Sequence, residues 1–127
     1  KAFTVSVPSE KYVKESDYFG IYSGKEADKF RASGLTPVKG SHVDAPYVNE
    51  FPLVLECRLL KTVEIGLHTQ FIGEIIDVKA DDDVIGDGGL PDLEKVRPFL
   101  FSPEVRVYHG VGKFLGKAFS IGREIEG

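Results

Sequence analysis

The sequence predicts an α+β or barrel-like domain, mainly β, in which a few long antiparallel strands are joined by short helices. Two observations lead to this fold class: the clearest apolar patterns have a period of two, and every helix signal is short. The length of 127 residues is typical of one domain, and no repeat, low-complexity tract or linker divides the chain. We therefore expect residues 1–127 to form a single domain.

The strongest pattern covers residues 53–65 and predicts a long strand. Leu55, Cys57 and Leu59 share one parity, whereas the polar Glu56 and Arg58 take the other. Because successive side chains of a strand point to opposite faces, we expect the first set to point inward and Glu56 and Arg58 to point outward. Cys57 is then expected to be a small buried side chain.

A second strand is expected over residues 68–79, after a turn at Gly66, so that the two strands form the longest antiparallel hairpin of the domain. Gly73, inside the second strand, indicates a bulge or the close approach of another part of the chain. Further alternating strands are expected at residues 3–7 and near Val105 and Val107.

Helix signals are confined to short stretches. Ser9 can cap a helix that runs towards Tyr18. Ser23 and Glu26 have the spacing of a capping box and predict the start of a second helix, which Gly34 would end. Of the remaining stretches, residues 36–52 are predicted to be irregular because of their prolines and glycine, and residues 92–97 to form one helical turn.

The composition excludes several classes of function. The 16 basic and 20 acidic residues give a net charge of −4, which disfavours binding to nucleic acids. No apolar run approaches the roughly 18 residues of a membrane-spanning helix, so we expect no membrane insertion. The single cysteine, Cys57, cannot form an internal disulfide, and with no secretory signal we expect a reducing cytoplasm.

The chain opens in an unusual way. Lys1 is not preceded by a methionine, and the residues that follow it already read as the middle of a strand. We therefore expect that Lys1 is not the natural start of the protein and that further sequence precedes it.

Five segments of the chain match one family in order. They are SGKEADKF at residues 23–30 with GLTP at 34–37, APYVNE at 45–50, LEC at 55–57, GLHTQFIGE at 66–74, and YHGVG at 108–112 with LG at 115–116. Together they resemble the flavin-reductase-like family of FMN-binding proteins, and the flavoredoxins within it.

The resemblance implies a fold, a cofactor and partners. It implies an antiparallel split β-barrel with FMN near the interface of a homodimer, of which this chain is the C-terminal part. It also implies an electron carrier that exchanges electrons with a redox protein such as a ferredoxin. An NAD(P)H-dependent flavin or ferric reductase remains the alternative, and a non-redox ligand-binding or dimerisation barrel is the alternative from another class.

Three residues match positions that family members use around the flavin. Lys29 suits the phosphate, because its ammonium is a compact charge; otherwise it is a solvated lysine paired with Asp28. His68, which opens a strand after a tight turn, could donate to a flavin carbonyl or help to place a nicotinamide. Phe101 lies between two prolines and could hold an aromatic ring against the flavin, or simply pack in the core. No catalytic residue is assigned.

Other chemistry is not indicated. The acidic stretch at residues 81–89 lacks the alternating ligands and closing glutamate of a calcium loop. The three histidines and one cysteine show no zinc-like spacing, so no metal site is predicted. No Gly-x-Gly-x-x-Gly motif or phosphate-binding loop occurs, so a nicotinamide would bind without a Rossmann domain.

Overall fold

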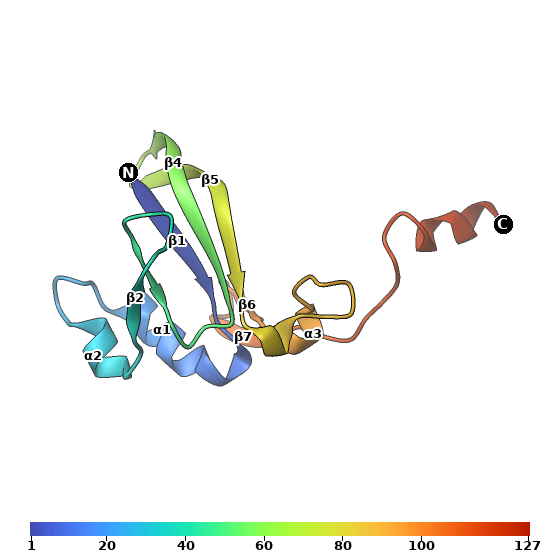
Figure 1. Ribbon diagram of the computed structural model, residues 1–127, viewed down its shortest axis with the longest axis horizontal. Coiled ribbons are helices and arrows are strands. Elements are labelled where there is room, and N and C mark those ends of the chain that lie inside the picture. Colours follow the sequence, from blue (N-terminus) through green and yellow to red (C-terminus); the bar gives the residue numbers. More distant parts are fainter.

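The computed structural model describes residues 1–127 as seven strands with short helices between them (Figure 1). With η denoting a 3-10 helix, the elements in chain order are β1 (Ala2–Val7), η1 (Glu10–Tyr12), α1 (Val13–Ile21), α2 (Lys29–Ser33), β2 (Pro37–Lys39), β3 (Pro46–Val48), β4 (Leu53–Ile65), β5 (His68–Ala80), η2 (Asp82–Val84), α3 (Leu93–Val96), β6 (Phe99–Ser102), β7 (Val107–Gly110) and η3 (Ile121–Glu126).

The strands form three antiparallel sheets. The largest has the order β1-β4-β5, while β2 pairs with β3 and β6 pairs with β7. Figure 1 shows the three long strands side by side, with α1 and α2 beside one end of this sheet and β6 and β7 behind the end of β5. None of the helices is both long and apolar enough to span a membrane.

The long hairpin has the predicted position. It runs from Leu53 paired with Ala80 to Ile65 paired with His68. Gly73 lies at a bulge, as one of its two predicted roles required, because the register shifts next to its partner Leu59; the close approach comes from a side chain and not from backbone, since a Cβ atom on Gly73 would lie 2.5 Å from Cζ of Phe3. The missing side chain therefore makes room for the Phe3 ring, which reaches across from β1.

The predicted faces of β4 hold for Cys57 and Arg58, Leu55 and Leu59 are only half-buried, and Glu56 is an exception. Cys57 is buried and Arg58 is exposed, as expected, and Arg58 forms an ion pair with Glu74 on β5. Glu56, however, is fully buried (0% exposed), so the prediction that it points outward was wrong. The physical reason is that the connection between β2 and β3, residues 40–45, folds over this face and donates backbone N–H groups to the carboxylate.

The helix starts differ from the predictions. Ser9 precedes η1 but makes no side-chain cap, and the α-helical turns begin only at Val13. Glu26 accepts a hydrogen bond from the Ser23 amide (2.8 Å), but this contact closes a turn. The helix itself begins after Asp28, whose carboxylate accepts from the Arg31 amide (3.2 Å). The predicted end is confirmed, because Gly34 adopts a left-handed conformation with φ of 76°.

Residues 36–52 are more regular than predicted, since they contain the β2–β3 pair. Pro37 and Pro46 are tolerated because each lies at the start of a short strand in a two-stranded sheet, where few backbone donors are needed. The strand expected at Val105 and Val107 begins only at Val107 and pairs as β6–β7, while Val105 lies in the turn between them; Phe101 lies on β6. The helical turn predicted at residues 92–97 is confirmed as α3.

The core is small and lies between the helices and the β2–β3 pair. Leu35, Val48 and Phe51 form its buried cluster, with Tyr12, Phe19 and Phe30 packed against it. In contrast, large apolar side chains of β5 remain exposed, among them Phe71, Ile75 and Val78. Residues 117–127 extend away from the rest of the domain (Figure 1). The main sheet thus carries an uncovered apolar surface.

Candidate functional site

Lys29, the first residue of α2, is half-buried and points back to α1. Its ammonium donates a hydrogen bond to the carbonyl of Phe19 (2.9 Å) and lies 5.4 Å from the centroid of the Phe19 ring. The carbonyls in the last turn of a helix carry partial negative charge and attract cations. Asp28 caps α2 and forms no ion pair with Lys29. An ammonium has three donors, so Lys29 keeps donors for a ligand.

Phe19 is one of the residues that line an open cavity of about 310 Å³. Hydroxyl groups of Thr4, Ser6 and Ser16 line it together with apolar side chains. The Ser16 hydroxyl is buried without a hydrogen-bond partner. Because buried polar groups in native structures nearly always find partners, this hydroxyl is a candidate ligand contact.

His68 is exposed at the tip of the long hairpin. It is the first residue of β5 and pairs with Ile65 across a turn formed by Gly66 (φ of 57°) and a fully exposed Leu67. Its imidazole makes no hydrogen bond or ion pair within the chain. It is therefore free to contact another molecule.

Phe101 belongs to an aromatic cluster on the β6–β7 hairpin. Its ring is 55% exposed and lies 5.3 Å, centroid to centroid, from the ring of Tyr108, which also contacts Phe99 edge to face. The Tyr108 hydroxyl donates to Asp17 on α1 (2.7 Å), and this hydrogen bond raises the pKa of Tyr108. The hydroxyl thus ties the hairpin to α1, while the face of Phe101 stays accessible.

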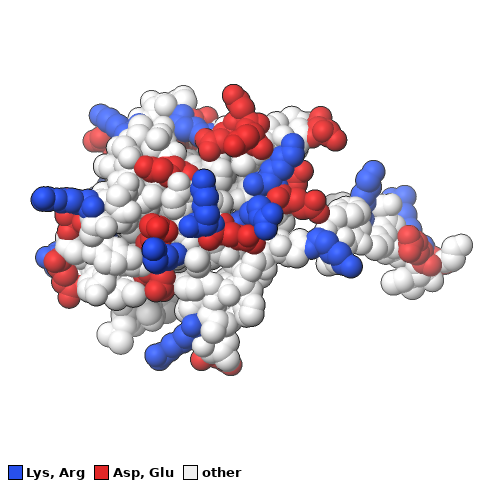
Figure 2. All heavy atoms as spheres, turned by 90° about the horizontal axis from the view of Figure 1, so that it is seen from below, with Lys and Arg blue, Asp and Glu red and all other residues white.

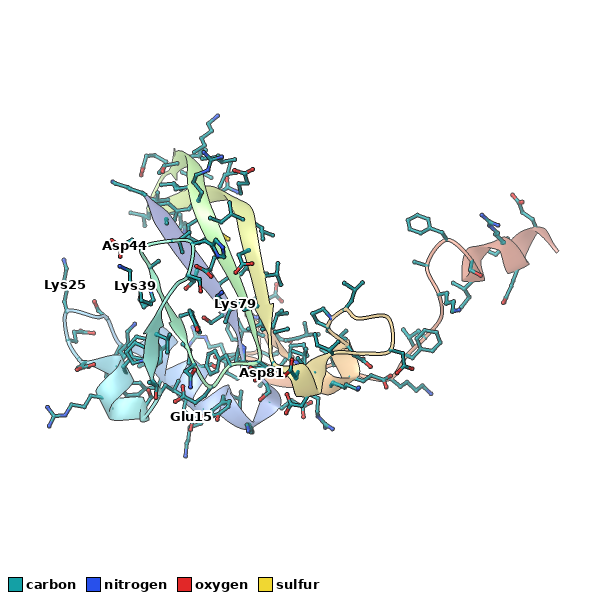
Figure 3. The ribbon with its side chains drawn as sticks, in the orientation of Figure 1. Glu15, Lys25, Lys39, Asp44, Lys79 and Asp81 are labelled. Atoms are coloured by element: carbon teal, nitrogen blue, oxygen red, sulfur yellow. The ribbon has the colours of Figure 1, made fainter.

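The structure does not bring Lys29, His68 and Phe101 into one pocket. They lie on α2, at the hairpin tip and on β6, and these elements are separated in Figure 1. None of the three lines any of the five main cavities. The cavity of about 320 Å³ between η1, η2 and α3 is lined instead by charged side chains of both signs, including Asp81 (Figure 3). Burial raises the pKa of Asp81, and the negative charges of Asp83 and Asp82 raise it further.

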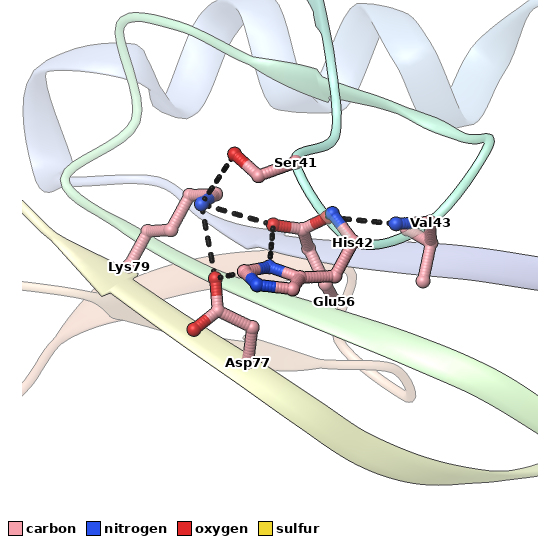
Figure 4. Close-up of polar contacts among 6 residues, drawn as sticks. All are labelled: Ser41, His42, Val43, Glu56, Asp77 and Lys79. Atoms are coloured by element: carbon pink, nitrogen blue, oxygen red, sulfur yellow. Dashed lines mark hydrogen bonds and ion pairs between the residues drawn. The ribbon is translucent and has the colours of Figure 1, made fainter.

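A polar cluster around Glu56 was not predicted. It combines the connection between β2 and β3 with β4 and β5 (Figure 4). One carboxylate oxygen of Glu56, Oε1, accepts hydrogen bonds from the backbone amides of His42 (2.9 Å) and Val43 (3.2 Å). Burial alone would raise the pKa of Glu56, but the His42 amide, the Lys79 ammonium and the Ser41 and Val43 amides together lower it to about 2.

Lys79 bridges the carboxylates of this cluster. Its ammonium lies 3.1 Å from Oε2 of Glu56, and it donates hydrogen bonds to Asp77 Oδ2 (2.9 Å) and Ser41 Oγ (2.9 Å). Asp77 and Glu56 both raise the pKa of Lys79. His42 completes the cluster, with Nδ1 3.2 Å from Asp77 Oδ2 and 3.9 Å from Glu56 Oε2.

One signal in the sequence could have indicated this cluster. In the β4–β5 register Glu56 lies directly opposite Asp77. Two carboxylates in directly opposite positions of an antiparallel pair repel each other unless a cation lies between them. If the pairing of the predicted hairpin had been continued from its turn, Glu56 would have been placed opposite Asp77, and Lys79 would have been the nearby cation to consider.

The charged residues elsewhere form no field of one sign on the face shown in Figure 2, where basic and acidic side chains alternate. Figure 3 shows one such pair, Lys39 and Asp44, at the connection between β2 and β3, and their charged groups lie 3.4 Å apart. Pairs as exposed as this contribute little to stability.

The antiparallel sheets and short helices define a split-barrel domain of the flavin-reductase type. The family model described as flavin reductase like domain matches residues 1–103, and the chain belongs to this family. The family and fold class predicted from the sequence are therefore confirmed.

Similar proteins support the assignment. The structure of a flavoredoxin of Desulfovibrio vulgaris (Miyazaki F) is 58% identical with a TM-score of 0.90, covering 95% of this chain and 64% of that one. The flavoredoxin from Methanosarcina acetivorans is 32% identical with a TM-score of 0.88, covering 96% and 64%. An uncharacterized protein of Archaeoglobus fulgidus is 38% identical over 91 residues, or 72% of this chain and 50% of that protein. The chain spans about half the length of the curated relatives it matches.

Proposed function

We propose that the protein binds FMN and transfers electrons through the flavin to or from a redox partner protein. Membership of the flavin reductase like family and the 58% identity to a flavoredoxin support this function. The observation in this chain that carries the proposal is Lys29, whose ammonium has no carboxylate partner and is anchored on Phe19, one of the hydroxyl-bearing and apolar residues that line a cavity.

The residues present fit the phosphate end of FMN. The Lys29 ammonium keeps donors that suit a phosphate, and the cavity that Phe19 lines adds the unpartnered Ser16 hydroxyl as a second possible donor. When bound, FMN would supply the redox chemistry, and the protein would bind the flavin and tune it. Lys29 is proposed to hold the phosphate, and His68 and Phe101 to contact the ring system.

The distance between the three proposed flavin contacts within one chain favours a site that two chains share. Lys29, His68 and Phe101 lie on separate elements of one chain, and both His68 and Phe101 are exposed. We propose a homodimer in which the flavin lies close to the subunit boundary, where exposed residues of a second chain are available to complete the site. Sedimentation of the full-length protein at micromolar concentration checks this; a monomer would contradict it.

The compartment is part of the same proposal. Cys57 is the only cysteine, and it is buried and free. A buried free thiol suits a reducing environment, and we propose that the protein works in the cytoplasm with a ferredoxin-like partner.

The test is spectroscopic. Full-length protein should be yellow as purified or after incubation with FMN, and dithionite should bleach its flavin absorbance. A colourless protein that FMN does not reconstitute would instead support a non-redox binding or dimerisation barrel.

A second measurement separates the two redox activities. Under anaerobic conditions an electron carrier should not oxidise NAD(P)H by itself, whereas a flavin or ferric reductase should do so and pass the electrons to free flavin or ferric iron. Capture of the partner with the flavin-loaded protein then identifies the physiological donor or acceptor.

A further inference from the structure

We propose that His42, Glu56 and Asp77 form a binding site for a divalent transition-metal ion of the zinc type, and that Lys79 occupies this site with its ammonium when no metal is bound. The proposal does not depend on the flavin. It rests on the distances between the ligand atoms, on the burial of Glu56, and on the charge balance of the cluster (Figure 4).

The distances suit a single small cation. One ligand atom from each of the three residues lies within 4.8 Å of the other two. Nδ1 of His42 lies 3.2 Å from Asp77 Oδ2 and 3.9 Å from Glu56 Oε2. With zinc bonds of about 2.1 Å, ligand atoms at neighbouring corners of a tetrahedron are about 3.4 Å apart. The two distances from His42 Nδ1 bracket this value, and the two carboxylate oxygens lie within 4.8 Å of each other.

Glu56 provides an independent observation. Its side chain is fully buried, Oε1 accepts two backbone hydrogen bonds, and Oε2 has the Lys79 ammonium as its one close polar neighbour, at 3.1 Å. The two amides thus fix the carboxylate with Oε2 directed at Asp77 and His42. The Lys79 ammonium now holds this position, because it pairs with Oε2 (3.1 Å) and donates hydrogen bonds to Asp77 and Ser41.

The charges of the cluster favour a divalent cation over the single positive charge of Lys79. Two carboxylates carry a charge of −2, and the ammonium of Lys79 contributes +1, so that with a neutral His42 the cluster keeps one negative charge. A divalent ion would balance both carboxylates. The side chain of Lys79 is 28% exposed, and its flexible stem allows the ammonium to move into water when the metal binds.

The ligand set also predicts selectivity. An imidazole combined with two carboxylates suits zinc, cobalt or nickel, whereas magnesium and calcium prefer oxygen ligands alone. A metal on Nδ1 requires that nitrogen to be unprotonated, which leaves the proton of the neutral ring on Nε2, and the exposed ring can present Nε2 to water.

The experiment is a calorimetric titration of zinc chloride into the full-length protein, freed of metal with a chelator, at neutral pH. We expect one zinc ion per chain. His42→Ala should weaken binding at least about tenfold, because a ligand is lost, and Lys79→Met should tighten it about tenfold, because the competing ammonium is lost. Magnesium should give no saturable heat. The matched control is His109→Ala, which removes an exposed histidine of β7 that lies outside the cluster and should leave the affinity unchanged.

Two results would overturn the proposal: no saturable zinc binding by wild type, or an equal affinity of wild type and His42→Ala. Should Lys79→Met fail to fold, Asp77→Asn takes its place, with the expectation of weaker binding; an unchanged affinity would again refute the site. Thermal unfolding gives a second readout. Zinc should raise the melting temperature of wild type and His109→Ala but not that of His42→Ala.

Discussion

Glu56 and Asp77 face each other directly across the β4–β5 ladder, and the ammonium of Lys79 lies between their carboxylates. Opposite carboxylates would destabilise an antiparallel pair, so this lysine makes the register tolerable. Glu56 also accepts hydrogen bonds from the backbone amides of His42 and Val43, so it holds residues 40–45 against the sheet. One buried carboxylate therefore joins three segments of the chain.

This arrangement predicts a dependence of stability on pH. The pKa of Glu56 is about 2 in the folded protein against a value of 4.5 without the fold. A depressed pKa contributes stability that is fully present above the unfolded pKa and is lost as the pH falls through the folded pKa. The loss from Glu56 should therefore occur between about pH 4.5 and 2, measured as the denaturation midpoint against pH.

The control variant for this prediction is Glu56→Gln, which keeps the shape but cannot titrate. It should be less stable than wild type at pH 7, and the difference should shrink as the pH falls towards 2. A constant difference across this range would show that the carboxylate charge does not contribute.

Lys29 is predicted to hold the phosphate of FMN. A hydrogen bond to a charged group contributes about 1.5–3 kcal/mol, so Lys29→Ala should weaken FMN binding roughly ten- to a hundredfold. Fluorescence titration of the full-length protein measures the affinity. Riboflavin, which lacks the phosphate, is the control ligand and should bind wild type and variant almost equally.

The structure adds an alternative to this test. Because Lys29 also donates to the Phe19 carbonyl, its loss could act through the packing of α1 and α2. An equal loss of affinity for FMN and riboflavin would indicate that structural role, and an unchanged affinity for FMN would contradict the phosphate contact.

Gly73 is predicted to be intolerant of any side chain. A Cβ atom there would meet Phe3 Cζ at 2.5 Å and the Arg58 carbonyl oxygen at 3.3 Å. Gly73→Ala should therefore destabilise the domain by about 1–3 kcal/mol, the usual cost of overpacking, measured by urea denaturation. Because the closer contact is with the ring, Phe3→Leu should recover part of the loss in a double-mutant cycle.

The matched control is Gly88→Ala, at a position where a Cβ atom would meet nothing within 4 Å. This variant should change stability by less than about 0.5 kcal/mol. Additive effects of Gly73→Ala and Phe3→Leu would mean that the two positions do not compete for the same space.

Much of the fold could be predicted because local patterns determine it. The alternation of residues 53–65 and the turn at Gly66 gave the bounds of β4 and the start of β5. The β2–β3 pair was missed because three-residue strands are too short for a period of two to be recognised. Glu56 was misplaced because alternation shows which residues share a face, but not that residues 40–45 cover the polar one.

The site could be predicted less completely. Lys29, His68 and Phe101 came from the family resemblance and remain predictions. The cluster of His42, Glu56 and Asp77 could not be seen as a spacing pattern, because its members come from three segments that only the folded chain brings together.

The closure of residues 40–45 over Glu56 also has a kinetic consequence. The β4–β5 hairpin is local in sequence and can form early, whereas β1 must reach β4 from the far end of the chain. The carboxylate can be enclosed only after its strand exists, and we expect the contacts with residues 40–45 to form late, on the native side of the folding barrier. Loss of these contacts should then speed unfolding while leaving the rate of folding almost unchanged. In stopped-flow measurements, Glu56→Gln should move only the unfolding limb of the chevron plot. Residues 40–45 would then prolong the lifetime of the native state without changing how fast it forms.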